Sequence, residues 1–125
     1  MVKSIGAIDI FAGAGGLGEG FHQGGFDILS SLDYNHHCCQ TLRTRIVFRY
    51  LMDINQLSLY SEYVRDKVTI EQLCNKFIKL TDLWEEGVRE IQLSEKNVSS
   101  ECSRITRILN SNGHRALDIL IGGPP

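Results

Sequence analysis

Three glycines and one aspartate near the start of the chain have the spacing of a cofactor-binding turn. Gly13, Gly15 and Gly18 form the pattern Gly-x-Gly-x-x-Gly, and Asp33 follows after about twenty residues. Glycine adopts positive φ and lets the backbone approach a ligand closely, while a helix N-terminus presents unpaired N–H groups. Such a turn suits a nucleotide-like cofactor. The same pattern also fits a surface turn that binds nothing.

The residues around these glycines predict the two elements that such a turn connects. Residues 5–10 form a short apolar run of strand length. After the glycines, Leu17 and Phe21 lie four positions apart, as on one face of a helix. We therefore expect a strand, a tight turn and the start of a helix.

Strands and helices are predicted to alternate further along the chain. Residues 26–33 form a second apolar run, and Asn35 is a suitable N-cap for a helix that extends to about residue 44. Residues 46–51 predict a third strand, which ends at Asp53. Two successive strand–helix–strand units imply parallel pairing through right-handed crossovers.

The stretch from residue 56 to residue 113 is mostly helical by its pattern. Thr69 and Gln72 have the spacing of a capping box, and residues 88–91 fit the continuation of a later helix. One crossover helix needs fewer residues, so we expect two or three helices, part of them an insertion before a fourth strand at residues 116–121. The predicted fold is α/β and Rossmann-like, with a doubly wound, mainly parallel sheet of about four strands.

Four predicted strand ends carry groups that suit a nucleotide, and open parallel sheets bind ligands outside these ends. At the first lie Phe11 and the glycines. At the second, Asp33 can accept hydrogen bonds from both ribose hydroxyls, and Tyr34 can pack on adenine. At the third, the Asp53 carboxylate can accept from the adenine amino group while Ile54 covers the ring. We expect Phe11, Asp33 and Asp53 to surround one hollow; the alternative for both aspartates is a helix cap or turn.

Asp9 favours a cofactor that carries positive charge. It ends the first predicted strand, close to where the pyrophosphate of a dinucleotide would lie, and like charges there repel. A sulfonium cofactor that also carries an ammonium group tolerates a carboxylate better. This favours S-adenosylmethionine over NAD.

The run His36-His37-Cys38-Cys39 is the one cluster of metal-ligand residue types. Contiguous residues of a helix point in different directions, so only His36 and Cys39 share a face. Zinc sites normally need four convergent ligands, and no second pair has fitting spacing. We predict no metal site.

The composition of the chain limits the number of domains, the partners and the cellular compartment that can be expected. The chain has 125 residues, which predicts one compact domain, and its net charge of −2 is not the footprint of a nucleic-acid-binding surface. We predict no signal peptide, and no apolar run in the sequence approaches the roughly 20 residues that span a bilayer. The four cysteines form no C-x-x-C pair, and a reduced cytoplasmic setting fits best.

Two segments of the chain resemble motifs of DNA cytosine-5 methyltransferases. Asp9-Ile-Phe-Ala-Gly-Ala-Gly-Gly-Leu17 resembles their first motif, which binds S-adenosylmethionine, and Asp118-Ile-Leu-Ile-Gly-Gly-Pro-Pro125 resembles their fourth. Together the two motifs bracket nearly the whole chain.

The resemblance assigns cofactor contacts to specific residues of four motifs. The family more often has Glu where this chain has Asp33, so the reach of that carboxylate is shorter here by one methylene. The residues implied to bind S-adenosylmethionine are Phe11, Ala12, Gly13, Gly15, Gly16 and Leu17, then Asp33 and Tyr34, then Asp53 and Ile54, and finally Gly123 and Pro125.

The catalytic half of the family's machinery is not found in this sequence. In the family, Pro-Pro continues into a cysteine whose thiolate attacks carbon 6 of a flipped-out cytosine and activates carbon 5 for methylation. None of the four cysteines here follows Pro-Pro, and no Glu-Asn-Val motif or target recognition domain is seen. We expect a fragment that ends just before the nucleophile, is inactive alone, and either self-associates or needs a complementary C-terminal part.

Other functions remain open at this point. Amino-group methyltransferases place Asn or Asp before Pro-Pro, but position 123 is Gly. An NAD(P)-dependent oxidoreductase fits the glycine spacing and Asp33, though not Asp9. A non-catalytic cofactor-binding subunit also fits. The resemblance implies DNA as the substrate, contacted through parts outside this chain, with tRNA less favoured.

Overall fold

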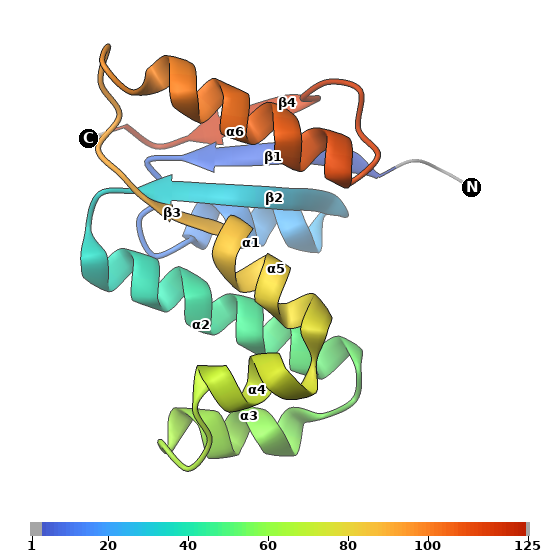
Figure 1. Ribbon diagram of the computed structural model, residues 1–125. Coiled ribbons are helices and arrows are strands. Elements are labelled where there is room, and N and C mark those ends of the chain that lie inside the picture. Colours follow the sequence, from blue (N-terminus) through green and yellow to red (C-terminus); the bar gives the residue numbers. More distant parts are fainter. Residues whose placement is uncertain (1–3, 125) are drawn as a thin grey trace.

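A computed structural model describes residues 4–124 and has a parallel sheet at its centre (Figure 1). The four strands are β1 (Ile5–Ile10), β2 (Phe26–Asp33), β3 (Val88–Glu90) and β4 (Ile119–Gly122), in the spatial order β3-β2-β1-β4. Every neighbouring pair of these strands is parallel. The predicted Rossmann-like α/β class is confirmed.

Six helices accompany these strands in the described part of the chain. No helix there is long and apolar enough to cross a membrane. The helices are α1 (Gly16–Gln23), α2 (His36–Asp53), α3 (Leu57–Val64), α4 (Ile70–Lys76), α5 (Ile78–Glu86) and α6 (Val98–Ser111).

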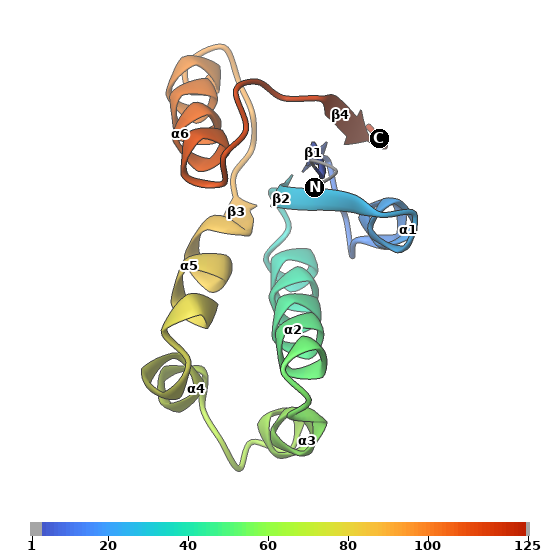
Figure 2. The same cartoon turned by 90° about the vertical axis from the view of Figure 1, so that its right-hand side faces the viewer.

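The helices cover both faces of the sheet, as a doubly wound fold requires (Figure 2). On one face, Ile8 of β1 packs with Ile108 and Leu109 of α6. On the other face, Val88 of β3 packs with Leu42 of α2. The two faces of the sheet thus contribute to two separate apolar cores.

Several local predictions are confirmed at the ends of the helices. The Asn35 side chain accepts a hydrogen bond from the backbone N–H of Cys38 and so caps α2. Thr69 and Gln72 form the predicted capping box at the start of α4. These side chains satisfy N–H groups that have no partner within their own helix.

The predicted third strand at residues 46–51 is wrong, because α2 continues without a break to Asp53. Val47 and Leu51 lie four positions apart and are both fully buried, against Leu73 of α4 and Leu80 of α5. The β-branched and aromatic residues of this segment favour a strand, but packing against neighbouring helices decides its conformation. The third strand is Val88–Glu90, where the sequence pattern predicts a helix.

Helices α3, α4 and α5 lie between α2 and β3 in the chain and extend away from the sheet (Figure 2). They share one apolar core with the C-terminal half of α2. The stretch that we expected to be helical thus contains three helices, then β3, and then the crossover helix α6.

A buried ion pair network holds β3 in place. Glu101 of α6 is 3% exposed, and its carboxylate accepts hydrogen bonds from Nε of Arg89 and Nε of Arg104, each over 2.9 Å. Arg104 also donates to the Ser30 hydroxyl of β2 over 3.1 Å. This network joins β2, β3 and α6, and thereby fixes the residue that follows Arg89 at the strand end.

Candidate functional site

The loop after β1 adopts the left-handed backbone conformations that its glycines predict. Gly13 has φ 58° and Gly15, the N-cap of α1, has φ 92°. Phe11 also has positive φ, 52°, and its side chain is 41% exposed. A bulky residue in this region is strained, and such strain concentrates at functional sites. The loop therefore holds an aromatic ring at the surface, at the C-terminal end of β1.

The remaining residues predicted in this loop differ in exposure. Ala12 is buried against Cys39 and Leu42 of α2, whereas Leu17, in the first turn of α1, is exposed. A methyl group on Gly15 would lie 2.7 Å from Cδ2 of Leu42, while one on Gly16 would meet no atom within 4 Å among the described residues. The loop thus packs tightly on α2 at Gly15 and is open at Gly16.

Asp33 lies beside this loop and is bound to it. Its Oδ2 accepts the backbone N–H of Gly13 over 2.8 Å, and its Oδ1 accepts that of Asn35, also over 2.8 Å. These bonds are those of a turn former, the alternative that the sequence left open. A carboxylate oxygen has two lone pairs, so each oxygen of Asp33 can accept one more hydrogen bond. Tyr34 follows with its side chain 65% exposed.

Asp9 is a buried carboxylate with no hydrogen-bond partner among residues 4–124 that meets ordinary geometry. Burial, and secondly the nearby charge of Asp33, raise the pKa of Asp9 from its ordinary value of 3.8 to about 6. The backbone N–H of Gly18 in α1 partly offsets this rise by lowering the pKa of Asp9, although it makes no hydrogen bond of ordinary geometry with the carboxyl group. An uncompensated buried carboxyl group next to the glycine loop suits a site for a positively charged ligand.

The end of the third strand carries Glu90 and Ile91 in place of Asp53 and Ile54. Glu90 lies opposite Asp33 in the parallel register of β2 and β3, and the Ile91 N–H donates to the Asp33 carbonyl oxygen over 2.8 Å. The Glu90 carboxylate pairs with Nδ1 of His36 over 3.0 Å. The sequence analysis assigned neither residue to the site, although an acidic residue followed by isoleucine is the pattern that it expected at the end of the third strand.

The placement of Asp53 and Ile54 at a strand end is wrong. Asp53 is the last residue of α2 and Ile54 is the C-cap of that helix. Asp33 precedes the start of α2, and an 18-residue helix is about 27 Å long. Phe11 and Asp33 thus lie together at the C-terminal ends of the strands, whereas Asp53 lies far from them.

The loop after β4 also lies at the C-terminal ends of the strands. Gly122 pairs with Ile10 in register, and a methyl group on Gly122 would lie 2.5 Å from the Ile10 carbonyl oxygen. Gly123 is exposed and has open space around it among the described residues. Pro125 lies outside the described residues.

A groove of about 610 Å³ lies elsewhere, between α1, α2 and α3. Its lining includes Glu19, Arg45 and Tyr60, so it is formed by helices and not by the loops that follow the strands. Arg45 donates from Nε to the Ala14 carbonyl oxygen over 2.9 Å, and Arg49 pairs with Glu19. Arg45 thus contacts the glycine loop, and Arg49 contacts the helix that follows it.

Comparisons with known proteins agree with this arrangement. The family model described as C-5 cytosine-specific DNA methylase matches residues 5–74. The chain is 33% identical over 132 residues to the Type II methyltransferase M.Bpa9945I of Bacillus paralicheniformis, a match that covers 94% of this chain and 30% of that protein. It is 54% identical over 39 residues to the Type II methyltransferase M.XorII of Xanthomonas oryzae pv. oryzae, covering 30% of this chain and 9% of that protein.

No solved structure matches the chain. The chain spans about a third or less of the length of these relatives. The family match covers more than half of the chain, and it contains β1, α1, β2 and α2 together with their loops. It favours the C-5 class over the amino-group methyltransferases and the NAD(P)-dependent oxidoreductases. The chain belongs to the family of C-5 cytosine-specific DNA methylases.

Proposed function

We propose that this chain binds S-adenosylmethionine at the C-terminal edge of its sheet, as the cofactor-binding part of a DNA cytosine-5 methyltransferase. The observation that carries this proposal is the strained, exposed Phe11 beside the hydrogen-bonded pair Gly13 and Asp33. The buried, unpaired Asp9 behind the same loop supports a ligand with ammonium and sulfonium charges. A pyrophosphate would be repelled there.

In this proposal the loops after all four strands contribute to the site. The Phe11 ring packs on the cofactor, and Asp33 accepts from the ribose hydroxyls with the lone pairs that its backbone bonds leave free. Glu90 and Ile91 take the adenine-binding roles that the resemblance implies for Asp53 and Ile54. The other proposed contacts are Ala12, Gly13, Gly15, Gly16, Leu17, Tyr34, Gly123 and Pro125.

When bound, S-adenosylmethionine supplies an electrophilic methyl group. This chain's residues hold and orient it, but none of the four cysteines follows Pro-Pro. Burial raises the pKa of the Cys39 thiol, which disfavours a thiolate there. We therefore propose that the nucleophile and the DNA contacts are supplied from outside these residues, so that this chain alone transfers no methyl group. We also propose that the substrate is DNA rather than tRNA.

The four free cysteines support a reducing, cytoplasmic setting.

Calorimetry on the full chain tests the proposed cofactor site. S-adenosylhomocysteine is expected to bind and NAD is not. Asp33→Asn should weaken the binding of S-adenosylhomocysteine by roughly tenfold or more, because hydrogen bonds to a charged group contribute about 1.5–3 kcal/mol. Asp53→Asn makes the same change at the far end of α2 and should leave the affinity unchanged. Binding of NAD without binding of S-adenosylhomocysteine would falsify the proposal.

A further inference from the structure

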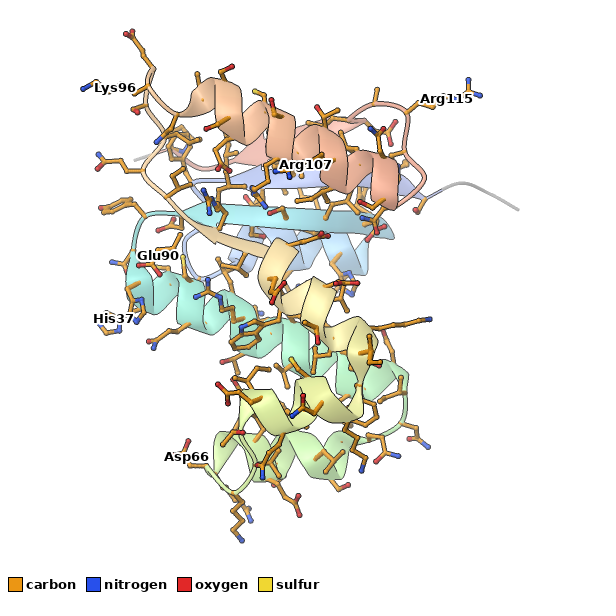
Figure 3. The ribbon with its side chains drawn as sticks, in the orientation of Figure 1. His37, Asp66, Glu90, Lys96, Arg107 and Arg115 are labelled. Atoms are coloured by element: carbon orange, nitrogen blue, oxygen red, sulfur yellow. The ribbon has the colours of Figure 1, made fainter. Side chains whose placement is uncertain are left out.

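At the end of β3, the Glu90 side chain pairs with His36, the first residue of α2. Nδ1 of His36 and Oε2 of Glu90 lie 3.0 Å apart, and the two residues are 54 positions apart in the chain. Figure 3 shows the labelled Glu90 near the first turn of α2, where the labelled His37 also lies. The Asn35 cap fixes this turn, and the pairing of Glu90 with Asp33 fixes the strand end. Both backbones that carry the pair are therefore held.

A glutamate at this position needs such a partner more than an aspartate does. Its side chain has one more rotatable bond, and it is 39% exposed. An unrestrained carboxylate loses rotamer freedom each time it binds a ligand, which weakens binding. A hydrogen bond from His36 to Oε2 leaves Oε1 as the oxygen that can accept from a ligand.

We propose that His36 is a positioning residue that holds Glu90 so that its free oxygen reads the 6-amino group of adenine. This inference rests on the proposed cofactor site. An amino group donates to the carboxylate, whereas the carbonyl oxygen of a 6-oxopurine would face it and repel it. His36 thereby acts on the choice between adenine and its deaminated counterpart, not merely on overall affinity.

The test compares two ligands that differ only at this position of the base. Calorimetry on the full chain gives the dissociation constants of S-adenosylhomocysteine and of S-inosylhomocysteine. The wild-type chain is expected to prefer the adenine compound by roughly tenfold or more, since the other compound leaves the site's carboxylate unpaired. Glu90→Ala should remove this preference. His36→Ala should reduce it at least roughly threefold, because the carboxylate is then no longer held.

Two further variants separate positioning from a structural effect. His36→Asn should restore most of the preference, because Nδ2 of Asn lies the same number of bonds from Cα as Nδ1 of His and also donates. His37→Ala changes the neighbouring histidine, which is not paired with Glu90, and should leave the preference unchanged. Thermal unfolding of each variant establishes that it is folded.

The possible results distinguish this inference from the proposed function. If neither compound binds, the cofactor site itself is wrong and the inference falls with it. If Glu90→Ala removes the preference but His36→Ala behaves like His37→Ala, the cofactor site stands and the positioning role is overturned. Equal weakening of both compounds by His36→Ala also overturns it, since that would be a general structural effect.

Discussion

The backbone N–H of Gly13 donates to Oδ2 of Asp33 over 2.8 Å, and this bond joins the loop after β1 to the end of β2. The left-handed backbone conformation of Gly13 turns its N–H toward the Asp33 carboxylate. Because Asp33 holds the loop, it stabilises the backbone that displays Phe11 as well as offering oxygens to a ligand. Changes at Asp33 are therefore expected to lower the stability of the loop together with cofactor affinity.

Two adjacent glycines are expected to differ sharply in their tolerance of a methyl group. Gly15→Ala should lower the free energy of unfolding by about 1–3 kcal/mol, since alanine at φ 92° is strained and its Cβ would lie 2.7 Å from Leu42. Gly16→Ala has open space at the first position of α1 and should be neutral or slightly stabilising. Urea denaturation of both variants measures the difference. Equal effects would contradict the described loop conformation.

The stability of the chain should depend on pH through Asp9. Its pKa in the folded chain is about 6, above the ordinary value of 3.8. The favourable contribution of the protonated carboxyl group is fully present below about pH 3.8 and is lost as the pH rises through about 6. At about 1.4 kcal/mol per pKa unit, the loss is about 3 kcal/mol.

Asp9→Asn removes this titration and should gain stability relative to the wild-type chain as the pH rises from 4 to 7.5. Urea denaturation of both proteins at several pH values gives the difference, in which the titrations of other groups cancel. If the two proteins show parallel pH profiles, Asp9 is not a buried, raised-pKa group.

Removal of the Glu101 carboxylate from α6 is expected to destabilise the chain strongly. Glu101→Ala leaves Arg89 and the largely buried Arg104 without their partner, and should lower the free energy of unfolding by roughly 3–5 kcal/mol. Cys102→Ala changes the exposed neighbour on the same helix and should have little effect. A small effect of Glu101→Ala would mean that the network does not hold β3.

The outer edge of β4 is expected to cause self-association. β4 pairs only with β1 in the described part of the chain, and Leu120 is 58% exposed there. Apolar strands at a sheet edge pair readily with other chains. Sedimentation should detect dimers or larger species at micromolar concentration, and Leu120→Lys should reduce them, whereas Leu83→Lys on α5 should not. A stable wild-type monomer would count against this.

Sequence patterns predicted those residues of the candidate site whose conformation depends on their neighbours in the chain. Spacing between glycines places Gly13 and Gly15 in a turn, and alternating apolar residues place Asp33 at the end of β2, because both features depend on neighbours in the chain. The cap at Asn35 was predicted for the same reason.

The third strand could not be found in this way. Residues 46–51 have the composition of a strand, and only contacts of Val47 and Leu51 with Leu73 and Leu80 reveal a helix. β3 has three residues and a single buried side chain, Val88, so it carries almost no periodicity. The missed strand is why the adenine contact was expected at Asp53, which ends α2, whereas the third strand ends at Glu90.

The central claim is that S-adenosylmethionine binds where the loops after β1, β2 and β3 meet. The most direct measurement is a titration of the full chain with S-adenosylhomocysteine, followed through the backbone amide signals in NMR spectra. The account predicts large shifts for Gly13, Tyr34 and Ile91 and none for Asp53 and Ile54. Shifts confined to the groove between α1, α2 and α3, or to the end of α2, would contradict it.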